Sequence, residues 1–181
     1  MLEIAITNRH LCKGDYFTQI EKIASHKPFA ILLREKDLDF DKYLTLSDEA
    51  NRICAAHRVP LIAHTHSVPG IPRLHVPFAL ATKNLAREYS LSVSVHSPEE
   101  ARMAEAMGAK FVIAGHIFAT ASKPNLPPRG LDFLREICDT VRIPVFAVGG
   151  IAVHDAQREN AQQCLDAGAA GICRMSYWMG L

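Results

Sequence analysis

Residues 143–176 read IPVFAVGGIAVHDAQRENAQQCLDAGAAGICRMS and contain a complete strand–helix–strand unit. The apolar runs Val145–Val148 and Gly171–Cys173 are short and do not alternate with polar residues, which is typical of strands buried on both faces. Residues 155–166 between them have a helical pattern that stops at Gly168. Because strands joined through a crossover helix run parallel, this segment predicts a parallel sheet covered by helices.

The same alternation extends back to the N-terminus. Further strands are predicted at residues 2–7, 29–33, 59–63, 73–76, 92–95 and 111–114, and further helices at 15–25, 41–56, 97–107 and 131–140. The clearest helix start is Ser97-Pro98-Glu99-Glu100, with Ser as N-cap, Pro at the first helical position and Glu at the third. Repeated strand–helix units in one domain favour a closed (β/α)₈ TIM barrel, with an open doubly wound sheet as the rival.

A barrel of this length has to be shortened. The chain has 181 residues, which suits a single domain over 1–181, whereas TIM barrels typically have about 250 residues. Residues 65–80 contain Pro69, Gly70, Pro72 and Pro77 and cannot hold a normal helix. The chain also stops five residues after Ser176. We therefore expect the barrel to be shortened between strands three and four and at the C-terminus.

Composition indicates a small-molecule protein of the cytoplasm. The net charge is +1, from 20 basic and 19 acidic residues, and no basic block suggests nucleic acid or a membrane surface as partner. There is no signal-peptide pattern, and no apolar run approaches the ~20 residues of a membrane span. The five cysteines are widely spaced without a CxxC pair, which argues against disulfides or zinc. The sequence leaves the oligomeric state open, a homo-oligomer included.

Candidate ligand-binding residues follow the predicted strands. Gly149-Gly150 after strand seven and Met175-Ser176 after strand eight lie where barrels often bind phosphate. Arg34 and Lys36 close strand two, and they either hold an anionic group or form a solvated charge run. The remaining candidates after strand six are His116, Thr120 and Lys123. A histidine there suits proton transfer at neutral pH, or it only hydrogen-bonds a neighbouring loop.

His64 and His66, with His75 nearby, raise the question of a metal site. No carboxylate occurs between Val59 and Leu85, so we expect His64 and His66 to line the pocket and predict no metal.

The stretches LLREKDLD (32–39), LSVSVHSPEEA (91–101), GAKFVIAGHIFATASK (108–123), IPVFAVGGI (143–151) and DAGAAGICRMS (166–176) resemble the thiamin phosphate synthase superfamily. The synthases carry an Asn-Asp pair after strand three and an Asp after strand four, which help to hold Mg²⁺ and pyrophosphate. This chain has Ala63-His64-Thr65-His66 and His75-Val76-Pro77 there. Gly115-His116 is instead similar to the thiazole tautomerase (TenI-type) branch.

The resemblance implies an isomerase of thiamin biosynthesis. Its substrate would be a small phosphorylated carboxythiazole, aromatised by proton transfer without a cofactor. His116 would be the acid/base, Ser94, Gly149, Gly150 and Ser176 would contact phosphate or ring, and Arg34 and Lys36 would neutralise its carboxylate or phosphate. Two alternatives remain: a thiamin phosphate synthase (a transferase) with an altered metal site, and a non-catalytic regulator that binds the thiazole phosphate.

Overall fold

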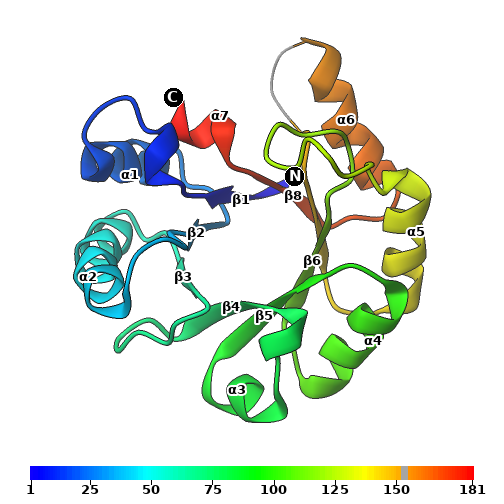
Figure 1. Cartoon of the computed structure of the whole chain (residues 1–181), viewed down its shortest axis with the longest axis horizontal. Coiled ribbons are helices and arrows are strands. Elements are labelled where there is room, and N and C mark those ends of the chain that lie inside the picture. The colour runs from blue at the N-terminus through cyan, green and yellow to red at the C-terminus, as the bar shows by residue number, and fades with distance from the viewer. Residues whose placement is uncertain (152–154) are drawn as a thin grey trace.

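Eight parallel strands form a closed barrel in sequence order (Figure 1). The computed structural model describes the backbone of residues 1–151 and 155–181 and the side chains of 1–151 and 159–181. The strands are β1 (Leu2–Ile6), β2 (Ala30–Leu33), β3 (Leu61–His64), β4 (Arg73–Pro77), β5 (Ser90–Val95), β6 (Phe111–Gly115), β7 (Val145–Val148) and β8 (Gly171–Arg174). Pairing of β1 with β8 closes the barrel. The predicted (β/α)₈ barrel is confirmed, and the open sheet is excluded.

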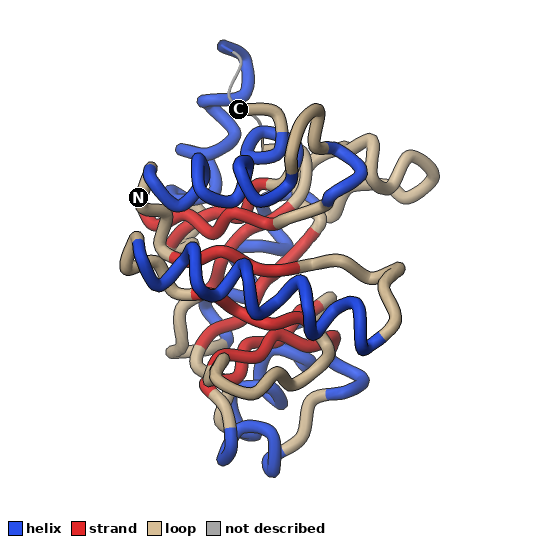
Figure 2. The backbone as a smooth tube through the Cα atoms, turned by 90° about the vertical axis from the view of Figure 1, so that its left-hand side faces the viewer, coloured by secondary structure: helices blue, strands red, loops and turns tan. Residues whose placement is uncertain are grey.

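Helices surround the barrel, and Figure 2 shows them outside the strands. They are α1 (Tyr16–Ser25), α2 (Phe40–Ala56), α3 (Lys83–Glu88), α4 (Pro98–Met107), α5 (Gly130–Thr140), α6 (Asp155–Asp166) and α7 (Ser176–Met179). The predicted start of α4 is present, because Ser97 Oγ accepts from the Glu100 amide (3.1 Å). The reciprocal bond of the capping box is displaced by one residue, since Glu100 Oε2 accepts from the amide of His96 (2.7 Å) rather than of Ser97. No helix in the described part of the chain is long and apolar enough to cross a membrane.

The barrel is shortened at both predicted places. Residues 65–72 join β3 to β4 without a helix and contain only an isolated bridge between Val68 and Ile71. At the C-terminus, α7 has four residues. The six-residue helix α3 was not predicted from the sequence. The barrel therefore closes with reduced cover after β3 and β8.

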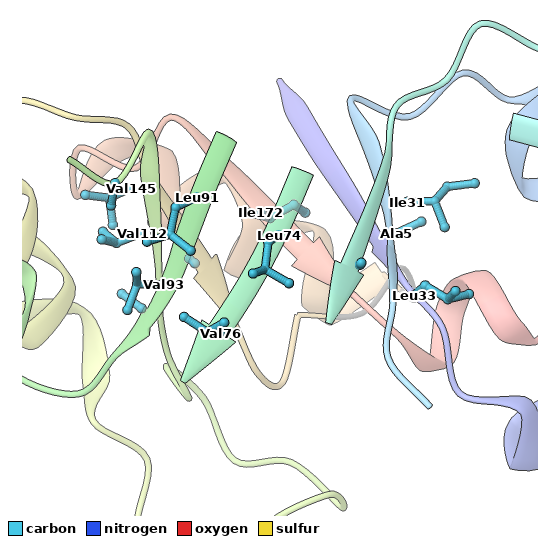
Figure 3. Packing of buried hydrophobic residues seen from close by; sticks show 14 of the residues in the cluster. Ala5, Ile31, Leu33, Leu74, Val76, Leu91, Val93, Val112, Val145 and Ile172 are labelled. Atoms are coloured by element: carbon cyan, nitrogen blue, oxygen red, sulfur yellow. The ribbon is translucent and has the colours of Figure 1, made fainter. Parts of the chain in front are cut away.

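The core has two layers. Strand residues that face the helices form the outer layer, among them Ala5, Ile31, Leu74, Val112 and Ile172 (Figure 3). The inner layer fills the barrel with Ile4, Ile6, Ala30, Leu32, Ile62, Ile113, Phe146 and Cys173. Because side chains alternate along a strand, the inner positions continue to the carboxyl ends, where polar residues replace apolar ones. Those ends form the candidate site.

Candidate functional site

Three cationic side chains gather at the carboxyl ends of the strands, which we call the mouth. Arg34 and Lys36 follow β2, and Lys123 lies in the loop between β6 and α5. Desolvation lowers the pKa of Lys36, and the charges of Arg34 and Lys123 lower it further. Desolvation also lowers the pKa of Arg34. In the described part of the chain none of the three forms an ion pair, and only Arg34 is partly offset by the charge of Glu35, so the mouth presents a net positive potential.

Glu35, between the two cations, faces the opposite way. Its side chain is 1% exposed and accepts hydrogen bonds from Thr7 Oγ1 (2.7 Å), Tyr16 OH (3.0 Å) and the Arg9 amide (3.0 Å). Thr7 Oγ1 in turn accepts from the Arg34 amide (3.0 Å). This network ties the loops after β1 and β2 together and keeps the carboxylate away from the mouth.

Two neutral imidazoles lie beside the cations. His64 and His75 are buried, and their ring centroids are 5.8 Å apart. Desolvation, followed by the charges of Lys36 and Arg34, lowers the pKa of His64 to about 4. Desolvation, followed by the neighbouring His64 and the cations, lowers the pKa of His75 to about 3. Both rings are therefore neutral at pH 7 and add donors and acceptors rather than charge.

His75 joins two serines of β5 into a hydrogen-bonded chain. Its Nδ1 lies 2.9 Å from Ser92 Oγ and its Nε2 lies 2.7 Å from Ser94 Oγ. Ser92 Oγ also donates to the Leu74 carbonyl (3.4 Å), so it accepts from Nδ1–H. The Nε2 lone pair then accepts the Ser94 proton, which leaves lone pairs of Ser94 Oγ for a ligand. The sequence could have indicated this contact, because alternation along neighbouring strands places His75, Ser92 and Ser94 on the inward face of the barrel.

Tyr43 of α2 braces the ends of β2 and β3. Its hydroxyl donates to the Leu33 carbonyl (2.8 Å) and accepts from the His64 amide (2.8 Å). The Leu33 carbonyl directly precedes Arg34, and the amide is that of His64 itself. One buried phenol therefore fixes the backbone from which the Arg34 and His64 side chains project. Sequence reasoning missed Tyr43, because nothing in a helical pattern marks a hydroxyl that reaches two strand ends.

The Gly149-Gly150 pair is required for a reason that sequence reasoning did not give. Both residues have positive φ, 102° and 68°. A Cβ on Gly149 would lie 2.3 Å from His116 Cβ, and one on Gly150 would lie 2.5 Å from the Ala119 carbonyl oxygen. A side chain here would therefore collide with the loop between β6 and α5. Their carbonyls accept from the Phe118 amide and Asn160 Nδ2, and within the described part of the chain their amides donate to no protein group.

His116 follows β6 and is 5% exposed. Its Nε2 lies 3.3 Å from the Leu126 carbonyl oxygen of the same loop. A carbonyl can only accept, so Nε2 carries the proton in the neutral ring and Nδ1 carries the lone pair. This arrangement leaves Nδ1 as the basic nitrogen.

The remaining predicted residues lie at the rim. His66 is exposed and packs its ring against Phe40 and Tyr43 of α2, with centroids 5.6 and 5.5 Å apart. Thr120 accepts from the Ser122 amide within its loop (3.4 Å). Met175 packs against the inner core, and Ser176 is exposed at the start of α7. Of His64 at the end of β3 and His66 after it, only His64 is buried beside His75.

The donor set of the mouth does not match Mg²⁺, which prefers carboxylate and other oxygen ligands. His64 ends β3 and pairs with His75 of β4, and the nearby charged groups, Arg34, Lys36 and Lys123, are cations. Among the described residues, no three His, Cys, Asp or Glu side chains gather as a metal site.

Comparison with known proteins identifies the family. A family model described as thiamine monophosphate synthase matches residues 3–177. The chain belongs to the thiamine monophosphate synthase family. One relative, thiamine-phosphate synthase 2 of Streptococcus pneumoniae serotype 4, is 32% identical over 177 residues, covering 92% of this chain and 82% of that protein. The putative thiamine-phosphate synthase 2 of Aquifex aeolicus is 31% identical over 184 residues, covering 97% and 96%.

A solved structure supports the thiamine monophosphate synthase assignment. Thiamine phosphate pyrophosphorylase from Pyrococcus furiosus superposes with a TM-score of 0.83 at 25% identity, covering 99% of this chain and 88% of that chain. The predicted superfamily is thereby confirmed, and the chain is a member of an enzyme family of thiamine biosynthesis. The relatives carry synthase names, and none of them singles out the tautomerase branch, which stays a prediction.

Proposed function

We propose that this chain aromatises a phosphorylated carboxythiazole by moving a proton from a ring carbon to the exocyclic carbon. The observation that carries the proposal is the donor set of the mouth. The neutral imidazole of His64 ends β3, and that of His75 lies beside it within β4. No carboxylate follows either strand before Leu85, whereas the resemblance implies that synthases have carboxylates there for Mg²⁺ and pyrophosphate. The mouth does have Arg34, Lys36 and Lys123, whose positive charges suit a phosphate or carboxylate.

The anionic groups of the substrate would bind to two parts of the mouth. Arg34, Lys36 and Lys123 supply positive charge from two loops. The amides of Gly149-Gly150 and of Met175-Ser176 supply N–H donors, as in many barrel phosphate sites. Ser94 would accept a hydrogen bond from the ring end of the ligand rather than contact phosphate, because its own proton is directed to His75.

His116 would carry the proton. Nδ1 takes it from the ring carbon, the electron pair of that C–H bond moves into the ring system, and the exocyclic carbon then receives a proton from the imidazolium. The Leu126 carbonyl, which accepts from Nε2–H, orients the ring so that Nδ1 carries the lone pair. The gain of aromaticity drives the reaction, so the protein only has to position substrate and base.

A second candidate is the synthase reaction, in which thiazole phosphate displaces pyrophosphate from the pyrimidine substrate. The names of the relatives favour it, and the three cations of the mouth suit a pyrophosphate. The residues at the ends of β3 and β4 do not suit the Mg²⁺ of that reaction, and we derive no step through the ion.

One pair of assays separates the candidates. The purified chain is incubated with the non-aromatic carboxythiazole phosphate while the absorbance of the aromatic product is followed. In parallel it receives aromatic thiazole phosphate, pyrimidine pyrophosphate and Mg²⁺. We expect isomerisation in the first assay, lost in His116→Asn and kept in the control His57→Asn, whose imidazole lies at the C-cap of α2. Coupling without isomerisation would favour the synthase.

A further inference from the structure

The opposite end of the barrel contains an aromatic hollow that the proposed function does not use. It has a volume of about 320 Å³ and lies at the amino ends of the strands. Phe29, Phe111 and Phe146 line it. The Phe146 ring stacks on Phe29, with centroids 5.5 Å apart at 28°, and meets Phe111 edge-on at 5.2 Å. The hollow therefore has a ready-made surface for a flat apolar ring.

Small inward residues keep this space open. Ala30 and Ser90 line the hollow where longer side chains would fill it. Gly171 is required by close packing, since a Cβ there would lie 2.3 Å from the Leu2 carbonyl oxygen and 2.8 Å from Phe146 Cε1. The barrel is thus packed in its middle by Ile4, Leu32 and Ile113 but left unfilled at its amino end. A volume of this size is at the lower end of the range of ligand pockets, which is about 300–1,000 Å³.

The charges around the hollow select for an anion. Arg73 from β4 and Lys110, just before β6, are exposed and line it. No carboxylate is among the lining residues. In the described part of the chain neither cation forms an ion pair. Ser90 adds a hydroxyl from β5, the strand between β4 and β6. An apolar ring among the phenylalanines would place an attached acidic group near this rim.

We propose that the hollow is a second binding site, which takes a small aromatic anion such as an arene carboxylate or sulfonate. The ring lies against the accessible faces of Phe29 and Phe111, which the buried Phe146 holds in place, and the acidic group pairs with Arg73 and Lys110. The site is separate from the mouth, since its residues lie at the other ends of the same strands. Its occupancy does not depend on the reaction catalysed at the mouth.

The test uses the full chain and two fluorescent probes of similar shape, anionic 1-anilinonaphthalene-8-sulfonate and uncharged N-phenyl-1-naphthylamine. We expect Arg73→Ala and Lys110→Ala each to weaken the sulfonate by about two- to fivefold, the range for exposed ion pairs. The uncharged probe should keep its affinity in both variants. Lys83→Ala, an exposed cation of α3, is the matched control and should change neither titration.

Ser90→Phe tests the place of the ring. Ser90 is exposed at the rim, so the larger side chain can enter the hollow without disturbing the inner core. Both probes should lose at least tenfold in affinity, with circular dichroism and melting temperature reporting that the barrel is intact. The proposal is overturned if the sulfonate titration responds to Arg34→Ala and Lys36→Ala instead, or if filling the hollow leaves both affinities unchanged.

Discussion

Replacement of Glu35 by Gln should destabilise the protein more than any other loss of a single negative charge near the mouth. The Glu35 carboxylate is buried and accepts from Thr7 Oγ1, Tyr16 OH and the Arg9 amide. Glutamine replaces one carboxylate oxygen by an NH₂ group, and this donor then faces one of the groups that donate to Glu35. Thr7 cannot simply reverse its role, because its oxygen already accepts from the Arg34 amide. The variant therefore loses one charge-assisted hydrogen bond or more, which corresponds to about 1.5–3 kcal/mol.

Urea unfolding followed by circular dichroism measures this loss, and thermal unfolding should show a fall of roughly 3–12 °C, since about 2–4 °C corresponds to 1 kcal/mol in a domain of this size. The matched control is Asp37→Asn, which removes an exposed carboxylate from the same Arg9. Exposed pairs contribute little, so its midpoint should stay near that of the wild type. Equal midpoints for the two variants would refute the view that Glu35 holds the two loops.

Three further outcomes follow from the geometry. Tyr43→Phe leaves the buried Leu33 carbonyl and His64 amide without their shared partner, and should cost about 1–3 kcal/mol of unfolding free energy in urea. Acidification from pH 7 to pH 5 should remove about 2 kcal/mol of stability for each of His64 and His75, because their pKa values of about 4 and about 3 keep them neutral when folded, while the unfolded chain takes up protons near the ordinary pKa of about 6.5. His75→Gln should remove about half of that pH dependence, since His64 remains. Gly150→Ala should lower both the melting temperature and the affinity for inorganic phosphate, measured by calorimetry, because its Cβ would push on the loop that carries Lys123; unchanged values in this variant would contradict the close approach.

The fold could be predicted because its signals are local. Buried parallel strands read as short apolar runs, and the Ser97 capping box and Gly108 mark the ends of α4. The proline-rich stretch after β3 predicted the missing helix for the same reason. The predicted limits of most strands differ from the observed ones by one or two residues, since hydrogen-bond pairing rather than composition sets where a strand ends.

The site could be predicted only in part, because its details depend on contacts between distant segments. Arg34 and Lys36 were found as charges at a strand end, and alternation alone could have indicated that Glu35 faces the other way. The partners of Glu35 come from the loop after β1 and from α1, which no spacing in the sequence reveals. The glycines after β7 were found, but their close approach to Phe118 and Ala119 depends on the course of a different loop.

The most direct test of the account is the initial rate at which the wild type and His116→Asn aromatise the carboxythiazole phosphate. We expect the wild type to turn the substrate over and the variant to lose about 10²- to 10⁴-fold, mainly in kcat, as is usual for a positioned acid/base. Affinity for the phosphorylated ligand should remain, because Arg34, Lys36 and the loops after β7 and β8 are unchanged. A folded His116→Asn protein with the wild-type rate, or a wild type that only couples thiazole phosphate to the pyrimidine at about 1 s⁻¹ or faster, would contradict it.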